Sequence, residues 1–140
     1  MEPVRVLLVD DNPTFLRIAA RFLEQEHCQE VVVVGTATGG EDALAKAKHL
    51  APQVVLLDLM MPGMNGLEVI PRLKAMLPEV YIVALTLLDT SSYRSAALSA
   101  GADAFIAKTA MNTELLPAIR RVPETRRVPV TGAISPSETS

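Results

Sequence analysis

The chain has 140 residues, 49% of them hydrophobic and 21% charged, which is typical of one domain that buries a sizeable core. Its net charge of -3 gives no support for non-specific nucleic-acid binding, and no apolar run is long enough for a signal peptide or a membrane span. The one cysteine, Cys28, cannot form an internal disulfide, so nothing requires an oxidising compartment. We therefore expect a cytoplasmic protein that binds neither membranes nor, through this domain, nucleic acid.

The first part of the chain alternates apolar runs with amphipathic segments. Val4–Val9 is an apolar run interrupted only by Arg5, which predicts a buried strand. Val31–Val34 predicts a second strand, and Thr38–Glu41 (TGGE) has the form of a capping box for a second helix, which Pro52 ends. Between these strands, helical spacing predicts a core-facing stripe made of Phe15, Ile18, Ala19, Phe22 and Leu23.

The middle of the chain begins with Val54–Leu57, an unbroken apolar run followed by Asp58. Such a run is typical of a central strand that is buried on both faces, as in a parallel sheet. The segment from Leu67 to Leu77 predicts a third helix. Pro71 lies inside it, so we expect a kink or a late start there.

The last part of the predicted domain repeats the pattern twice more. Tyr81–Leu85 predicts a fourth strand, and Asp89 or Thr90 could cap the helix that follows. That helix is serine-rich and small-sided, so it should be the most loosely packed. Ala104–Ala107 predicts a fifth strand. A final helix has a core face made of Leu115, Leu116, Ile119 and Val122.

Five βα repeats predict an α/β fold, with a doubly wound, parallel five-stranded sheet, right-handed crossovers and helices on both faces. We expect residues 1–122 to form this domain. Residues 123–140 are rich in Pro, Ser and Thr and lack apolar periodicity. This composition predicts a linker or a tail.

Polar residues follow four of the five predicted strands: Asp10 and Asp11, then Asp58, Thr86 and Lys108. Each could be a plain strand-end or turn residue. In an open parallel sheet, however, the carboxyl ends share one edge, and ligands bind there where the strand order reverses. Three carboxylates meeting at that point would repel by about 4 kcal/mol per close pair at ~4 Å and an effective dielectric constant of ~20. One lysine cannot neutralise three carboxylates, whereas Mg²⁺, which prefers oxygen ligands, can.

With these residues in this order, the chain from about residue 4 to 122 resembles the receiver domain of two-component response regulators. The resemblance is carried by Asp10-Asp11, by Asp58 within DLMMPGMNG, by Thr86, and by Lys108 with Phe105 three residues before it. It implies the flavodoxin-like receiver fold with strand order 2-1-3-4-5. It also implies a phosphoacceptor signalling domain rather than an enzyme with turnover.

The resemblance assigns the reacting groups. Asp58 would be the nucleophile that takes a phosphoryl group from a sensor histidine kinase or a phosphotransfer protein, forming an aspartyl phosphate. Asp11 and Asp58 would bind Mg²⁺ directly, together with the backbone carbonyl of Met60, and Asp10 would bind it largely through water. The metal would neutralise charge on the transferring oxygens.

The resemblance also implies a switch. Lys108 would pair with the phosphoryl oxygens, and the Thr86 hydroxyl would move inward to bond one of them, leaving room for Phe105 to rotate. The face formed by the fourth helix, fifth strand and fifth helix would then bind a different partner, either a downstream target or a second copy of the chain. The alternative for Phe105 is a plain core aromatic.

The chain departs from the family pattern at several positions near the expected site. Leu87 follows Thr86, where a small residue is usual, and Thr109 follows Lys108, where many members have proline. Leu88 and Met60 occupy positions where some members have polar residues that guide hydrolytic water. We therefore expect a long-lived phosphoryl group.

Two other functions compete with this interpretation. A magnesium-dependent aspartyl-phosphate phosphatase would need two aspartates separated by one residue after the first strand, and Asn12 stands at the third position. A flavodoxin-like flavin binder would need a phosphate loop rich in Ser, Thr and Gly, where this chain has two acids. The output is open between a stand-alone receiver and the N-terminal part of a DNA-binding transcriptional regulator.

Overall fold

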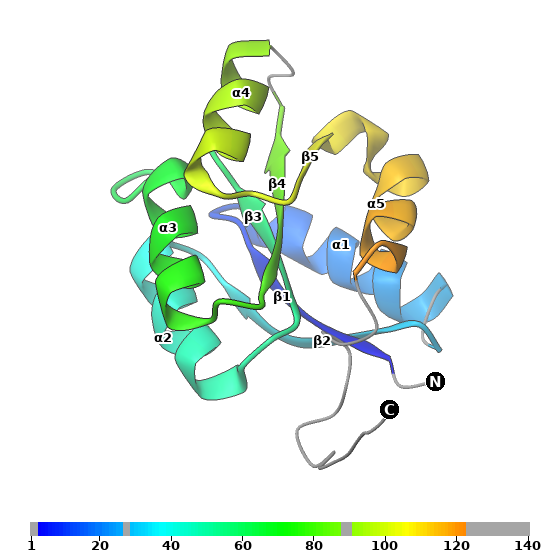
Figure 1. The fold of residues 1–140 in the computed structure, drawn as a ribbon. Coiled ribbons are helices and arrows are strands. Elements are labelled where there is room, and N and C mark those ends of the chain that lie inside the picture. The colour runs from blue at the N-terminus through cyan, green and yellow to red at the C-terminus, as the bar shows by residue number, and fades with distance from the viewer. Residues whose placement is uncertain (1–2, 27–28, 88–90, 123–140) are drawn as a thin grey trace, which may run out of the picture.

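The computed structural model describes residues 3–26, 29–87 and 91–122, and these form the predicted α/β fold (Figure 1). The sheet has five parallel strands in the order β2-β1-β3-β4-β5, as the resemblance implied. The strands are β1 Val4–Val9, β2 Val31–Ala37, β3 Val54–Asp58, β4 Tyr81–Thr86 and β5 Ala104–Ala107. The helices are α1 Pro13–Glu26, α2 Gly40–Leu50, α3 Gly66–Met76, α4 Ser91–Ala100, the 3₁₀ turn η1 Lys108–Ala110 and α5 Met111–Arg120. Within the described ranges, no helix has the length and apolar character needed to cross a membrane.

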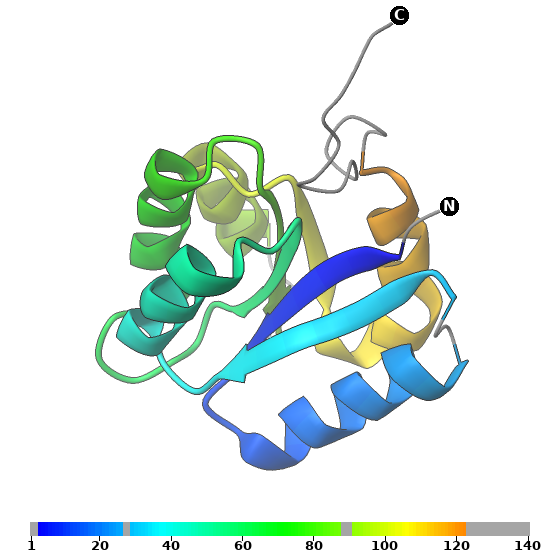
Figure 2. The same cartoon turned by 90° about the horizontal axis from the view of Figure 1, so that it is seen from below.

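The sheet lies between two helical layers, which Figure 2 shows from below. Alternate side chains of a strand point to opposite faces, so β1 divides its apolar residues between two cores. Val6 and Leu8 pack in the core with α1 and α5, whereas Leu7 and Val9 pack in the core with α2 and α3. All five residues of β3 are buried. The doubly covered central strand that the sequence predicted is therefore confirmed.

The core-facing stripe of α1 differs from the prediction at two positions: it lacks Ile18 and includes Leu16, which the prediction omitted. Ile18 is 57% exposed, whereas Leu16, Ala19 and Leu23 are buried. Leu16, Ala19 and Leu23 follow i, i+3, i+7 spacing and turn toward the sheet, with Phe15 and Phe22 at the edges of the stripe. The prediction that Ile18 faces the core is therefore wrong.

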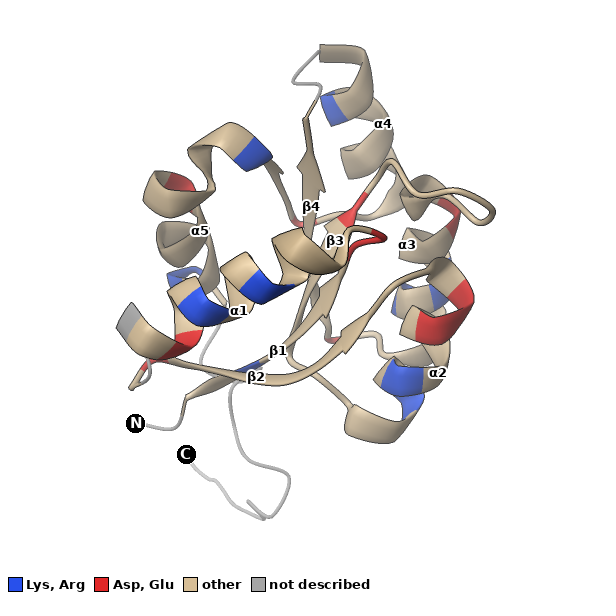
Figure 3. Cartoon of the chain, turned by 180° about the vertical axis from the view of Figure 1, so that it is seen from behind, with Lys and Arg blue, Asp and Glu red and all other residues tan. Residues whose placement is uncertain are grey.

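The predicted capping box at Thr38–Glu41 does not form. Gly39 is the N-cap of α2, and it has no side chain that could accept a hydrogen bond. Instead the Thr38 amide donates to Asp42 Oδ2 at 3.4 Å. The helix has acidic residues in its first turn and basic residues in its last (Figure 3), which complements the helix dipole.

The later helices mostly follow the prediction. α3 begins at Gly66 and continues through Pro71, so of the two expected alternatives, a kink or a late start, the late start does not occur. α4 has a single buried residue among those described, Ala97, and the prediction that it is the most loosely packed helix is confirmed. The four core residues predicted for the last helix are all buried. The positions of Cys28, Leu88, Asp89, Thr90 and the predicted tail lie outside the described residues.

Candidate functional site

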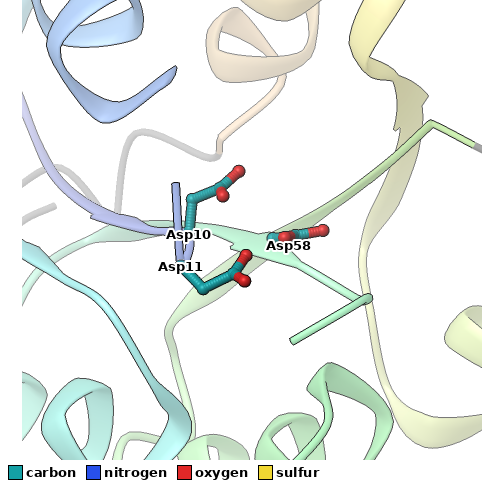
Figure 4. A group of neighbouring side chains, drawn as sticks. All are labelled: Asp10, Asp11 and Asp58. Carbon is teal, nitrogen blue, oxygen red and sulfur yellow. The ribbon is translucent and has the colours of Figure 1, made fainter. Parts of the chain in front are cut away.

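Three acidic side chains meet at the carboxyl ends of β1 and β3. The parallel register pairs Val9 with Leu57, so the next residues along these strands, Asp10 and Asp58, lie next to each other. One carboxylate oxygen each of Asp10, Asp11 and Asp58 lies within 4.8 Å of the others (Figure 4). Asp10 and Asp58 are buried and Asp11 is exposed. The predicted convergence of the three acids is confirmed.

Lys108 enters the same site from the end of β5. Its Nζ lies 2.5 Å from Asp10 Oδ2 and 3.5 Å from Asp58 Oδ2. Thr86 is fully buried at the end of β4 and pairs with Ala107, the residue before Lys108. The sheet therefore places all five of the polar residues that follow its strands at the same edge.

In each buried aspartate, one carboxylate oxygen accepts a loop amide and the other lies near Lys108. Oδ1 of Asp10 accepts the amide of Asn12 at 2.8 Å, and Oδ1 of Asp58 accepts the amide of Met60 at 3.0 Å. The Oδ2 atoms of both face the Lys108 ammonium. The loop amides thus fix the orientation of both carboxylates before any ligand binds.

The electrostatics of the site are unfavourable for a bare Asp58 carboxylate. The pKa of Asp58 is raised from 3.8 to about 6, chiefly by burial and also by repulsion from Asp10 and Asp11, while the hydrogen bond from the Met60 amide and the charge of Lys108 act in the opposite direction. One ammonium does not balance three carboxylates, so a cation would be stabilised there. The donor set consists of hard carboxylate oxygens, two fixed and one open to solvent, and it fits Mg²⁺ with water in its remaining positions.

Gly66, the last residue of the DLMMPGMNG motif, supports the site. A β-carbon at Gly66 would lie 2.7 Å from the carbonyl oxygen of Asp58 and 2.7 Å from Cα of Leu59. The Gly66 amide donates to the Leu59 carbonyl at 3.2 Å. The start of α3 therefore packs directly on the backbone that carries Asp58. Asn65, which caps α3 by accepting the Glu68 amide at 3.1 Å, was the signal that could have located this contact.

The predicted switch aromatic lies on the far side of β5 from the α1 layer. Phe105 is buried in the core with α3 and α4, and its ring is covered by Arg94 of α4, whose Cζ lies 4.8 Å from the ring centroid. Two of the apolar residues that depart from the family pattern are exposed to solvent: Met60 is 45% exposed and Leu87 is 70% exposed. The peptide bond between Lys108 and Thr109, like the others in the described ranges, is trans.

Comparison with known proteins gives consistent matches. Residues 6–120 match the family model of the response regulator receiver domain. Response regulator GacA of Pseudomonas protegens is 38% identical over 119 residues, covering 85% of this chain and 55% of GacA. Response regulator protein VraR of Staphylococcus saprophyticus is 36% identical over 121 residues, covering 85% of this chain and 56% of VraR. The chain thus spans about half the length of the curated relatives it matches.

Solved structures give the same match for the fold. The signal receiver domain of the response regulator NarL from Mycobacterium tuberculosis superposes with a TM-score of 0.75 at 32% identity, covering 86% of this chain and 99% of that one. The likeness extends over nearly the whole described domain.

Proposed function

The chain belongs to the response regulator receiver domain family, and we propose that it accepts a phosphoryl group on Asp58 in a magnesium-dependent reaction. The observation that carries this proposal is the convergence of three carboxylates and one ammonium at the carboxyl edge of the sheet. We take Asp58 as the acceptor in this group, because it ends the central strand β3 and is less closely paired with Lys108 than Asp10 is.

Asp11 and Asp58 would hold Mg²⁺ directly, with the backbone carbonyl of Met60, and Asp10 would hold it through water. When bound, the metal neutralises charge on the transferring phosphoryl oxygens. Asp11 can approach a hydrated cation because it is exposed, while the buried Asp10 and Asp58 are fixed by their loop amides. A site with two fixed, buried carboxylates and one exposed carboxylate suits a metal that keeps part of its water shell.

In the transfer step, an Asp58 oxygen forms a bond to phosphorus as the bond from phosphorus to the donor breaks. From a phosphohistidine, the imidazole leaves with the electron pair of the broken bond and takes up a proton. Asp58 acts as the carboxylate, and at neutral pH most of it is ionised even with its pKa raised to about 6. Lys108 is close enough to turn from Asp10 toward the new phosphoryl oxygens.

Phosphorylation would then act on Thr86 and Phe105. The new group has about two negative charges and three acceptor oxygens, and the Thr86 hydroxyl at the end of β4 would bond one of them. Phe105 would then rotate inward, away from Arg94. A groove of about 570 Å³ lies on the α4-β5-α5 face, with Arg94 and Phe105 on one side and Thr113 and Pro117 on the other. We propose that this face changes its partner when Asp58 is phosphorylated.

We also propose that the phosphoryl group on Asp58 is long-lived. Met60 exposes an apolar side chain directly beside Asp58, where a polar group would be needed to orient an attacking water. Leu87 is likewise apolar and exposed next to Thr86. A phosphoryl half-life of seconds at neutral pH would contradict this prediction.

The donor would be a sensor histidine kinase or a phosphotransfer protein, and we expect the domain to meet it in the cytoplasm. The target stays open between a separate protein, a second copy and a DNA-binding output domain of a transcriptional regulator. The magnesium-dependent phosphatase is the alternative. It is disfavoured because Asn12, which caps α1 with its side chain, occupies the position where such an enzyme needs a second aspartate.

Incubation with acetyl phosphate, a small phosphoryl donor, tests the proposal. Intact-mass spectrometry should detect one added phosphoryl group in the parent with Mg²⁺, and none with EDTA or in Asp58→Asn. Peptide mapping should assign the group to Asp58. Sustained release of inorganic phosphate over many turnovers would instead support the phosphatase, and labelling of Asp58→Asn would overturn the choice of acceptor.

A further inference from the structure

The ammonium of Lys108 has an aromatic neighbour in addition to its two carboxylates. Its Nζ lies 4.4 Å from the centroid of the Phe15 ring, a distance at which a cation is attracted to the negative face of the ring. We propose that Phe15 is a positioning residue for Lys108, holding the ammonium between Asp10 and Asp58 and guiding it to the phosphoryl group. This role rests on the proposed function.

The surroundings of Lys108 explain why a third neighbour matters. An ammonium has three N–H donors, and the carboxylates within 4 Å of Lys108 Nζ in the described residues are those of Asp10 and Asp58. The side chain is only 11% exposed, so water has little access to solvate the rest of the charge. The π face of Phe15 stabilises this part of the charge in place of water, and it adds no further negative charge to an already acidic site.

Phe15 is held by the same loop that carries the acids. The Asn12 amide donates to Asp10 Oδ1, and the Asn12 side chain accepts the amides of Thr14 at 2.9 Å and Phe15 at 3.3 Å. One residue thus orients both Asp10 and the first turn of α1. The Phe15 ring and the Asp10 carboxylate, which both contact the ammonium, are therefore fixed relative to each other.

This arrangement gives Lys108 a path during the reaction. When a phosphoryl group forms on Asp58, the ammonium must leave Asp10 for the new oxygens. It can do so while staying over the ring, so that it keeps one neighbour throughout the movement. An aliphatic side chain at position 15 would fill the same space but would leave the ammonium free to adopt other positions.

A purely structural role for Phe15 makes a different prediction. The ring also packs at the edge of the α1 and α5 core, and so does Phe22, which lies seven residues later, about 10 Å along the helix axis. Both side chains are half-buried. Phe22→Leu is therefore the matched control, because it removes an aromatic ring from the same helix and the same core without touching the site.

The test compares Phe15→Leu, Phe15→Met, Phe15→Tyr and Phe22→Leu with the parent, using acetyl phosphate, Mg²⁺ and NMR of Lys108. In the parent and in Phe15→Tyr, the ring current should move the Lys108 ε-proton signals upfield. Phe15→Leu and Phe15→Met should lose that shift and slow phosphorylation by about three- to tenfold. Phe22→Leu should keep both the shift and the rate.

Two results would overturn the role of Phe15 alone: an unshifted Lys108 signal in the parent, or equal rates in Phe15→Leu and Phe22→Leu. Phe15→Met and Phe15→Tyr keep the test decisive if Phe15→Leu does not fold. A parent that takes up no phosphoryl group would overturn the proposed function and this role together, so the two failures are distinguishable.

Discussion

Lys108 lies closer to Asp10 than to Asp58: its Nζ is 2.5 Å from Asp10 Oδ2 and 3.5 Å from Asp58 Oδ2. The lysine that we propose serves a phosphoryl group on Asp58 is thus paired mainly with the neighbouring acid. On the proposed function, Mg²⁺ would bind the same carboxylates and would therefore compete with Lys108 for them. Metal binding should weaken the pair and free the ammonium for the phosphoryl oxygens.

This competition predicts that Lys108→Met binds Mg²⁺ more tightly than the parent, by about tenfold, because one positive charge no longer repels the ion or occupies its ligands. The same variant should be phosphorylated slowly, since it lacks the group that pairs with the phosphoryl oxygens. Isothermal titration calorimetry measures the affinity. Lys46→Met is the control, since Lys46 pairs with an exposed acid, Asp42, on α2. Unchanged or weaker binding by Lys108→Met would contradict the prediction.

The raised pKa of Asp58 predicts that removing the charge of this carboxylate stabilises the folded protein, and that the gain depends on pH. Burial, followed by repulsion from Asp10 and Asp11, raises this pKa from 3.8 in the unfolded chain to about 6 in the fold. The folded state therefore prefers the protonated form, and this contribution is complete below the unfolded pKa and is lost as pH rises through about 6. In EDTA at neutral pH, Asp58→Asn should raise the free energy of unfolding by about 2 kcal/mol, because asparagine can still accept the Met60 amide.

Urea unfolding followed by circular dichroism, with and without Mg²⁺, measures this gain. It should vanish in acid and shrink with Mg²⁺, which stabilises the parent through its carboxylate. Asp42→Asn, at an exposed acid on α2, is the control. A metal-free Asp58→Asn that is less stable than the parent at neutral pH would refute the electrostatic description of the site.

The close approach of α3 to the Asp58 loop predicts that Gly66 tolerates no side chain. Gly66→Ser would place an atom against the carbonyl of Asp58 and Cα of Leu59, and the displaced backbone should cost about 2 kcal/mol of stability or more and weaken Mg²⁺ binding. Gly39→Ser is the matched control, because a β-carbon there meets nothing within 4 Å and serine is favoured as an N-cap. Equal stability and metal affinity in the two variants would argue against a supporting role for Gly66.

The contact between Arg94 and Phe105 should oppose the inward rotation of Phe105 that we propose for the switch. The Arg94 guanidinium lies over the Phe105 ring in this structure, and the contact would be lost if Phe105 rotates inward. Arg94→Ala should therefore bind beryllofluoride, a phosphoryl mimic, about two- to fivefold more tightly in the presence of Mg²⁺. Arg94→Lys retains a cation, so its affinity for beryllofluoride should lie between that of the parent and that of Arg94→Ala. NMR titration gives the affinities, and weaker binding by Arg94→Ala would show that the contact does not oppose the switch.

The sheet and the acidic cluster could be predicted from the sequence because local patterns determine them. The apolar run before Asp58 is buried on both faces, and such a run has few alternatives to a central parallel strand. Once the strand order is known, the positions of Asp10 and Asp58 follow from the shared edge of the sheet. Helical spacing was less decisive, since Ile18 fits the same periodicity as its buried neighbours and only the rotation of α1 against the sheet excludes it.

The supporting contacts could not be predicted, because they join segments that are distant in the sequence. Nothing near Phe15 indicates that its ring meets Lys108, and nothing near Arg94 indicates that it covers Phe105. Thr38 had the right spacing for a capping box, but the N-cap of α2 is Gly39, and the Thr38 amide donates to Asp42 instead. The positions of such side chains depend on how the loops pack, which no local pattern specifies.

The most direct test of the central claim is amide NMR of the parent and of Asp58→Asn during titration with beryllofluoride and Mg²⁺. In the parent, saturable shifts should appear at Asp58, Thr86, Phe105 and Lys108 only when both ions are present, and Asp58→Asn should show none of the beryllofluoride-dependent shifts. Identical shifts in the two proteins, or a parent whose Thr86 and Lys108 signals do not move, would contradict the assignment of this crevice as a metal-assisted phosphoacceptor site.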